Sequence, residues 1–267
     1  MQGAGNDFVV FDNREHGFLL DEIISMTPRL CHRRFGVGAD GLLVLMTCAD
    51  GADYRMIYRN ADGSDAGMCG NGARCLAKFA HSKGFGTDLR FMVHDKLYLA
   101  KVDDQEVTIH FPVEPKPGKF MQLEGFEALE VYSGTEHVVL WVDDETLENE
   151  DYLRTCGSKI RWDAKTFPKG TNVNFIPQNA TSNNIQMKTF ERGVEDLTLA
   201  CGTGALATSV SHHHKFGNKA TGTFDYVIES NGGILKTRFH YEESTQTYSK
   251  LELSGPAVSV FEGTYYL

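Results

Sequence analysis

The strongest constraint on this chain of 267 residues is a short motif that it carries twice. Residues 69–75 read Cys-Gly-Asn-Gly-Ala-Arg-Cys, and residues 201–207 read Cys-Gly-Thr-Gly-Ala-Leu-Ala. The two leading cysteines lie 132 residues apart, about half of the chain. A run compatible with a helix follows each motif and ends near a glycine, Gly84 in the first copy and Gly217 in the second.

Two further segments repeat in the same order upstream of the cysteines. Gly5-Asn-Asp-Phe-Val-Val and Gly134-Thr-Glu-His-Val-Val each join a glycine turn and two polar residues to a β-rich run. The short runs that begin at Gly41 and Asn172 are typical of strands and stand at similar distances before their cysteines. Three similarities in one order predict two halves of equivalent architecture, each with a helix that begins at its Cys-Gly motif.

We therefore expect an α/β fold of the α+β kind, with two pseudo-symmetric, strand-rich domains, each with a central helix. The join is expected where three prolines interrupt a strand pattern between residues 112 and 118. The tail reads as a strand at residues 257–261 that returns to the first half. The predicted domains are residues 1–113 together with 255–267, and residues 114–254.

Composition opposes several classes of protein. The formal net charge of −10 argues against nucleic acid binding, because phosphate recognition needs a basic face. No stretch approaches the roughly 18 apolar residues of a membrane helix, and the opening residues lack the basic head and apolar run of a signal peptide. Six scattered cysteines without a Cys-x-x-Cys pair oppose a disulfide framework or a zinc site. We expect a cytoplasmic protein with a small-molecule partner, no membrane and no metal.

Two patterns resemble ligand motifs but have simpler explanations. Residues 36–41 match G-x-G-x-x-G, yet a helix-like segment at 23–35 precedes them and a strand at 42–46 follows. This order is the reverse of a dinucleotide site, so we interpret the segment as a loop. His212, His213 and His214 are adjacent on a predicted helix, where neighbouring side chains diverge and do not converge on one ion. We interpret them as a solvated helix end.

The cysteines at the two predicted helix starts differ from the others. We interpret the remaining four as small, inert apolar side chains: Cys31, Cys48, Cys75 and Cys156. First-turn N–H groups have no helical partners and carry the positive end of the helix dipole, so they bind a carboxylate. The same environment lowers the pKa of a thiol toward neutrality, which makes a thiolate available as a base.

Two such helix starts can hold one carboxylate between them, with a cysteine on each side of its α-carbon. One thiolate removes the α-proton, the helix starts stabilise the enediolate-like charge, and the opposite thiol protonates the other face. The sequence thus predicts an enzyme that inverts a carbon next to a carboxylate without a cofactor. Asn60 and Arg192 each stand nine residues before a motif cysteine and could reach the same cleft.

The chain resembles the diaminopimelate epimerases, a family of amino-acid epimerases that use no pyridoxal phosphate. The matching segments are residues 3–8, 60–64, 68–75, 170–175, 191–193 and 200–204. The resemblance implies two pseudo-symmetric domains with the active site between them, and a homodimer. It also implies epimerisation of LL- to meso-diaminopimelate, a step toward lysine and peptidoglycan precursors.

The same resemblance implies roles for individual residues. Cys69 and Cys201 match the acid/base pair. The reacting carboxylate would be held by the backbone N–H groups of Gly70, Asn71, Gly202 and Thr203. The far amino-acid head group would be held by Asn6, Asn60, Asn172, Glu191 and Arg192. Arg192 can bind a far carboxylate in bidentate fashion, Glu191 can bind a far ammonium, and His137 and Glu191 can adjust the pKa values of the thiols.

One departure from the family pattern leaves the substrate open. Where the family carries Gly-Asn-Pro-His, this chain carries Gly134-Thr-Glu-His137, in which Thr135 is still able to hydrogen-bond the substrate. A related racemase or epimerase for histidine or a lanthionine-like thioether is therefore an alternative. A catalytically silent amino-acid-binding protein on the same fold is a third hypothesis, and the presence of both cysteines argues against it.

Overall fold

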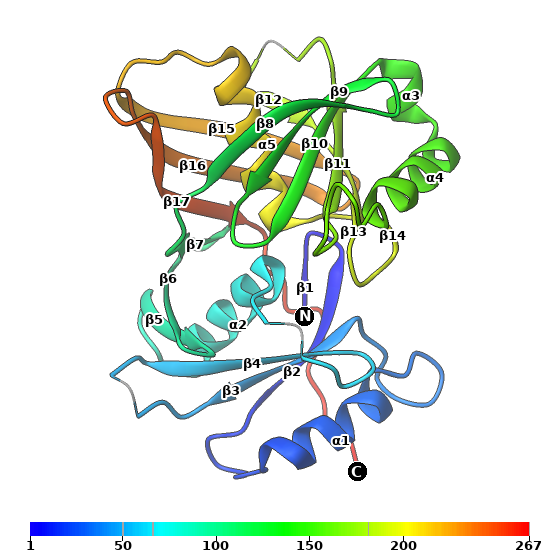
Figure 1. Cartoon of the computed structure of the whole chain (residues 1–267). Helices are drawn as coiled ribbons and strands as arrows, with labels where there is room; N and C mark the ends of the chain where they lie inside the picture. Colours follow the sequence, from blue (N-terminus) through cyan, green and yellow to red (C-terminus); the bar gives the residue numbers. More distant parts are fainter. Residues whose placement is uncertain (50, 66, 181, 267) are drawn as a thin grey trace. The chain divides into compact units, whose positions relative to one another are not determined.

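The structure, a computed structural model, describes residues 1–49, 51–65, 67–180 and 182–266 (Figure 1). The chain forms two compact units, Met1–Pro112 with Ser254–Leu267, and Val113–Leu253. Both units combine helices and strands, so the strand-rich mixed α/β class is confirmed. None of the helices in the described ranges is long and apolar enough to cross a membrane.

The strands of the first unit pair in chain order, and α1 and α2 pack against them. The strands are β1 (Gln2–Gly3), β2 (Asn6–Asp12), β3 (Gly41–Met46), β4 (Tyr54–Asn60), β5 (Asp88–Val93), β6 (Lys96–Val102) and β7 (Val107–Phe111). The helices are α1 (Leu20–Cys31) and α2 (Gly70–Ser82), on opposite sides of β3 and β4 in Figure 1.

Strand β3 is covered on both faces, which explains its unbroken apolar sequence. Leu42 and Val44 pack in a cluster with Ile23 of α1. Leu43 points to the other face, where its side chain lies 3.0 Å from the place that a Cβ on Gly72 of α2 would occupy. Because helix α1 precedes β3, the G-x-G-x-x-G match has the order expected of a loop and not of a dinucleotide site.

The second unit holds two sets of paired strands around helix α5. One sheet has the order β14-β13-β11-β10-β9-β8, and a second set has the order β17-β16-β15-β12. The strands are β8 (Lys116–Leu123), β9 (Phe126–Tyr132), β10 (Glu136–Val142), β11 (Asn172–Pro177), β12 (Asn184–Gln186), β13 (Lys188–Glu191), β14 (Asp196–Thr198), β15 (Gly222–Ser230), β16 (Gly233–Glu242) and β17 (Thr247–Gly255). The helices are α3 (Asp144–Glu148), α4 (Glu150–Arg161) and α5 (Gly202–Phe216). Helix α5 contacts strands of both sets and lies at the centre of this unit in Figure 1.

The repeat inferred from the sequence reappears in the strand pairing of the two units. In the first unit β2 and β3 run parallel, and β4 pairs antiparallel with β3. In the second unit β10 and β11 run parallel, and β13 pairs antiparallel with β11. Helix α2 follows β4 in the chain, and α5 follows β13 and β14, so each motif cysteine stands after the same three-strand arrangement.

The chain tail departs from its predicted structure. Residues 257–261 were expected to form a strand, but Val258 makes only an isolated antiparallel bridge to Gln2 and the residues around it are irregular. The backbone of this segment does bond to that of Gln2 in both directions, at 2.9 and 2.8 Å. The tail therefore returns to the first unit, as expected, without becoming a strand.

Two of the three histidines of α5, His212 and His213, are buried, so the interpretation of the run as a solvated helix end was wrong for them, whereas His214 is half-buried. His213 is fully buried, with its ring centroid 4.3 Å from that of Phe224, and its Nδ1 lies 3.0 Å from the hydroxyl of Tyr248. His212 is 2% exposed and its Nε2 lies 2.9 Å from the carbonyl oxygen of Ala180. The sequence pattern suggested solvent because histidine is polar, whereas strands surround α5. Among the described residues, no group of His, Cys, Asp and Glu side chains could hold a metal.

Buried His213 predicts a pH-dependent stability. Burial lowers its pKa to about 4, whereas a histidine in the unfolded chain titrates near about 6.5. The neutral ring therefore contributes stability that is fully present above about pH 6.5 and declines as the pH falls toward 4, by at most about 1.4 kcal/mol per pH unit. Urea unfolding at a series of pH values should show a shallower decline for His213→Phe, while His16→Phe, at an exposed site, should keep the wild-type slope.

Candidate active site

Both motif cysteines are the residues immediately before a helix, as expected. Cys69 precedes α2 with φ −115° and ψ 118°, and Cys201 precedes α5 with φ −119° and ψ 113°. The sulfur of Cys69 accepts the N–H of Gly72, and that of Cys201 accepts the N–H of Gly204, each at 3.4 Å. A neutral thiol is a weak acceptor, whereas a thiolate accepts such bonds strongly. The two helix starts therefore favour ionisation of the sulfurs that they hold.

Close packing explains the third residue after each cysteine, a glycine in both motifs. A Cβ on Gly204 would lie 2.5 Å from Oδ1 of Asn174 and 3.2 Å from the Cys201 sulfur. A Cβ on Gly72 would lie 3.0 Å from a methyl carbon of Leu43. The helix thus starts against a neighbouring side chain in both units. The first-turn residues whose backbone was expected to bind the carboxylate occupy these starts: Gly70, Asn71, Gly202 and Thr203.

Asn6 touches Cys69 in the first unit, and its orientation is set by a carboxylate. The Nδ2 of Asn6 donates to Oδ2 of Asp40 at 2.6 Å, and its Oδ1 lies 3.8 Å from the Cys69 sulfur. Because a carboxylate only accepts, the amide oxygen must face the cysteine. Arg33 bonds to Asp40 at 2.6 Å and to Asp7 at 2.8 Å, which holds the carboxylate in place.

Asn60 lies at the same sheet edge as Asn6. It ends β4, where it pairs with Gly41, and Gly41 pairs in turn with Phe8 of β2. Its Nδ2 donates to the hydroxyl of Ser64 at 3.0 Å, which ties the amide to the loop that leads toward α2. The structure therefore brings Asn6 and Asn60 to one edge of the first unit.

The residues of the second unit that were expected to bind the far head group of the substrate, here called the distal residues, also gather at one end of their sheet. They are Asn172, Glu191 and Arg192. Asn172 begins β11, and its Oδ1 accepts the backbone N–H of Arg192 at 2.9 Å while its Nδ2 donates to the carbonyl of Glu136. Arg192 follows β13 and donates from Nη2 to the hydroxyl of Thr135 at 2.7 Å. Glu191, the last residue of β13, pairs with Asp196 across the ladder.

Glu136, at the position where this chain departs from the family pattern, forms ion pairs with two cations. Its carboxylate lies 3.2 Å from Nη1 of Arg192 and 3.6 Å from Nζ of Lys169. Burial raises the pKa of Glu136, but its own backbone N–H and the two cations outweigh this and lower it below its ordinary value. Glu136 is therefore an anion that shares the guanidinium of Arg192.

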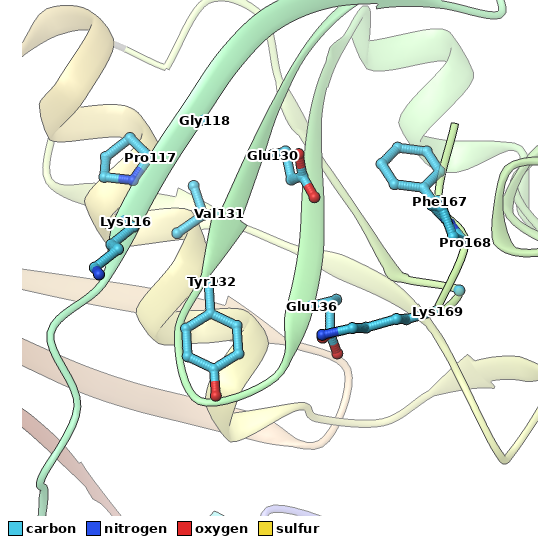
Figure 2. Close-up of a pocket in the computed structure, with 11 residues that line it drawn as sticks. Lys116, Pro117, Gly118, Glu130, Val131, Tyr132, Glu136, Phe167, Pro168 and Lys169 are labelled. Atoms are coloured by element: carbon cyan, nitrogen blue, oxygen red, sulfur yellow. The ribbon is translucent and has the colours of Figure 1, made fainter. Parts of the chain in front are cut away.

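A pocket of about 430 Å³ in the second unit adjoins these residues. Its lining includes Glu136, Lys169 and Gly170, all of which contact Arg192. Figure 2 shows the side chain of Lys169 extended toward Glu136, with Tyr132 on the neighbouring strand. The distal residues therefore stand beside a hollow that could receive a small polar group.

His137 acts on the second helix start through Thr203. The ring is fully buried; its Nε2 lies 2.9 Å from the Thr203 hydroxyl, and its Nδ1 lies 3.1 Å from Nδ2 of Asn174. That amide also donates to the carbonyl of Val138, so its nitrogen faces Nδ1, which must accept. Nε2 therefore carries the proton and donates to Thr203, whose hydroxyl lies 3.6 Å from the Cys201 sulfur.

Burial lowers the pKa of His137 to about 3, so the ring is neutral near pH 7. The route that the structure shows from His137 to Cys201 is therefore a chain of neutral hydrogen bonds through Thr203.

Sequence reasoning missed three polar residues that the structure places beside the expected ones: Asp40, Glu136 and Asn174. Asn174 had a detectable signal, because it is polar within the buried run of β11. Asp40 lies in the loop that was set aside with the G-x-G-x-x-G match, and Glu136 was noticed only as a departure. Their partners come from segments far apart in the chain, so spacing alone could not pair them.

The model of the diaminopimelate epimerase family matches residues 1–110 and 129–258. This chain belongs to the diaminopimelate epimerase family. A diaminopimelate epimerase of Chlorobaculum tepidum is 39% identical over 273 residues, which cover 100% of both chains. A diaminopimelate epimerase of Aquifex aeolicus is 34% identical over 276 residues, covering 98% of this chain and 95% of that relative.

Solved structures with the same fold are more distant in sequence. A hydroxyproline epimerase from Agrobacterium vitis has a TM-score of 0.67 at 15% identity, covering 96% of this chain and 87% of that one. A phenazine biosynthesis protein of the PhzF family from Enterococcus faecalis has a TM-score of 0.65 at 14% identity, covering 98% and 94%. The diaminopimelate epimerase family thus shares its architecture with proteins of other names.

The close packing at Gly204 predicts a costly substitution. In Gly204→Ala the added methyl group would meet Asn174, whose amide is held by Val138 and by Thr189. We expect a loss of roughly 1–3 kcal/mol in the free energy of unfolding, because the amide of Asn174 cannot move away from the methyl group without losing these two hydrogen bonds. Urea denaturation measures this loss. Gly86→Ala, where a Cβ meets nothing within 4 Å, is the matched control and should leave the midpoint nearly unchanged.

Proposed function

We propose that this chain epimerises LL-diaminopimelate to meso-diaminopimelate, with Cys69 and Cys201 as the two acid/base groups. The observation that carries the proposal is the pair of cysteines that precede α2 and α5 with matching backbone angles and matching sulfur contacts. Membership of the diaminopimelate epimerase family supports the substrate. The proposal also includes a homodimeric assembly and a cytoplasmic location. Only the family relation supports these two parts.

The chemistry follows from the properties of a thiolate at a helix start. One sulfur, as a thiolate, takes the α-proton and becomes a thiol, and the electron pair left on the α-carbon is delocalised into the substrate carboxylate. First-turn N–H groups stabilise that negative charge. The other sulfur, as a thiol, delivers its proton to the opposite face and becomes a thiolate. The proton count balances over the turnover, and the proposal requires both sulfurs to reach one α-carbon.

The distal residues suit a substrate with a second amino-acid head group. Arg192 is positioned through its backbone by Asn172 and through its side chain by Thr135. Its guanidinium can form the bidentate contact that a carboxylate favours. The carboxylates of Glu136 and Glu191 can bind an ammonium. A one-headed amino acid would leave these groups without a ligand.

Serine variants of the motif cysteines test the proposal directly. Cys69→Ser and Cys201→Ser should each lose epimerisation by roughly a hundredfold or more, because a serine hydroxyl is a far weaker acid than a thiol and does not ionise to a base near neutral pH. Nuclear magnetic resonance of each diaminopimelate stereoisomer in D₂O measures α-hydrogen exchange. The two variants should differ in the stereoisomer whose exchange survives.

Cys48→Ser, outside both motifs, should exchange and epimerise like the wild type. Wild-type rates of epimerisation in either motif variant would end the two-cysteine assignment.

Removing the distal guanidinium should affect only substrates with a far carboxylate. Arg192→Gln should raise the KM for diaminopimelate roughly tenfold to a hundredfold, since a charged hydrogen bond contributes about 1.5–3 kcal/mol. Exchange of the α-hydrogen of lysine, which lacks the second carboxylate, should be unchanged. Arg154→Gln is the matched control, because Arg154 pairs with Glu150 and Asp196 on α4 and β14. Equal effects on both substrates would show that Arg192 serves folding and not recognition.

The ion pair between Glu136 and Arg192 favours a second candidate substrate. Glu136 and Thr135 already bind the guanidinium, which reduces its capacity for a far carboxylate. An amino acid without a far carboxylate, such as histidine, is the alternative that this ion pair favours. Faster α-hydrogen exchange of histidine than of diaminopimelate in D₂O would support it.

A further inference from the structure

Arg74 is a buried cation that the proposed chemistry does not use. The side chain is fully buried in the first unit. Its Nη2 donates to Oδ1 of Asn71 at 2.8 Å, and its Nε donates to the carbonyl oxygen of Pro256 at 3.3 Å. Its Nη1 is buried without a hydrogen-bond partner, and no carboxylate in the described part of the chain pairs with it. The guanidinium is therefore held by neutral oxygens alone.

Such an arrangement costs free energy unless an anion compensates the charge. Burial lowers the pKa of Arg74 to about 10, so the side chain still carries its charge near pH 7. A buried charge without a partner is strongly destabilising, and neutral oxygens supply only dipoles. The bond to Asn71, the second residue of α2, directs the guanidinium toward the start of that helix.

Two thiols interact electrostatically with Arg74: Cys75 and Cys69. Burial raises the pKa of Cys75 to about 12, although Arg74 and the α-ammonium group of Met1 oppose this, so Cys75 stays neutral. Cys69 is only partly buried and its sulfur accepts the N–H of Gly72. Of these two thiols, Cys69 is the one that can ionise and compensate the buried charge.

The repeat provides an internal comparison for this charge. The position of Arg74 in the first motif is taken by Leu206 in the second, and that of Asn71 by Thr203. Thr203 bonds to His137, which is neutral near pH 7. The first turns of α2 therefore carry the buried charge of Arg74, whereas Leu206, at the equivalent position of α5, is uncharged.

We propose that Arg74 is a positioning residue whose buried charge makes Cys69 the more acidic of the two motif cysteines. Cys69 then rests as the thiolate and Cys201 as the thiol. The amide oxygen of Asn6 opposes this ionisation, but it is a neutral dipole at 3.8 Å and weaker than a full charge. The roles of the two sulfurs in turnover rest on the proposed function, whereas their order of ionisation does not.

Alkylation by iodoacetamide tests the order, because the thiolate is the reactive form. The labelling rates of Cys69 and Cys201 in the whole chain are measured by peptide mass spectrometry between pH 5 and pH 10. In the wild type Cys69 should ionise at the lower pH. In Arg74→Met its labelling midpoint should rise by on the order of one pH unit, with a roughly tenfold slower rate at pH 7. The midpoint of Cys201 should not move.

Two variants separate charge from packing. Leu206→Met places the same side chain at the equivalent buried position of α5 and should shift neither midpoint. Arg74→Lys keeps the charge and should retain the low midpoint of Cys69. An unchanged Cys69 midpoint in folded Arg74→Met, judged by circular dichroism, would overturn the proposal.

The wild-type order is a second and independent test that needs no variant. If Cys201 ionises first, the proposal is wrong whether or not Arg74→Met folds. Labelling needs no substrate, so it can succeed where the proposed function fails. If Cys69 ionises before Cys201 but the protein exchanges no α-hydrogen, the role of Arg74 stands and the proposed function is wrong.

Discussion

The candidate site depends on one interaction, the bond from a first-turn backbone N–H to a cysteine sulfur. It occurs at the start of α2 and again at the start of α5, with the same length in both. Sulfur is a poor helix cap while it is protonated, and it becomes a good acceptor once it has lost its proton. The helix start therefore couples the backbone to the protonation state of the side chain. A glycine in the first turn leaves room for a neighbouring side chain, Leu43 beside Gly72 and Asn174 beside Gly204.

The two units repeat their backbone but differ in the polar groups behind it. A parallel strand pair and one antiparallel strand precede each motif cysteine. Behind the second residue of α2 stands a buried guanidinium, and behind the second residue of α5 stands a buried neutral imidazole. Duplication thus supplied two similar frames, and different side chains made them electrostatically unequal. On the proposed role of Arg74, this inequality decides which of the two sulfurs is the thiolate in the free protein.

On the proposed function, the guanidinium of Arg192 binds the far carboxylate, and its neighbours hold it in place. Arg192 donates hydrogen bonds to Thr135, Glu136 and the carbonyl of Lys169. A guanidinium held in this way loses less conformational freedom on binding, but it must share its donors with the carboxylate of Glu136. Thr135 and Glu136 therefore share the guanidinium that the proposed function assigns to the far carboxylate.

Local patterns in the sequence determined the repeat, the helices that start after Cys69 and Cys201, and the strand that begins at Gly41, because each depends on neighbours within a few residues. Burial and pairing were decided by the tertiary structure. The sequence alone placed His213 in solvent and made a strand of the tail, and it could not find the buried charge of Arg74 or the pairing of Asn174 with His137. Those properties depend on segments brought together from distant parts of the chain, such as Pro256 beside Arg74, and no spacing rule encodes such contacts.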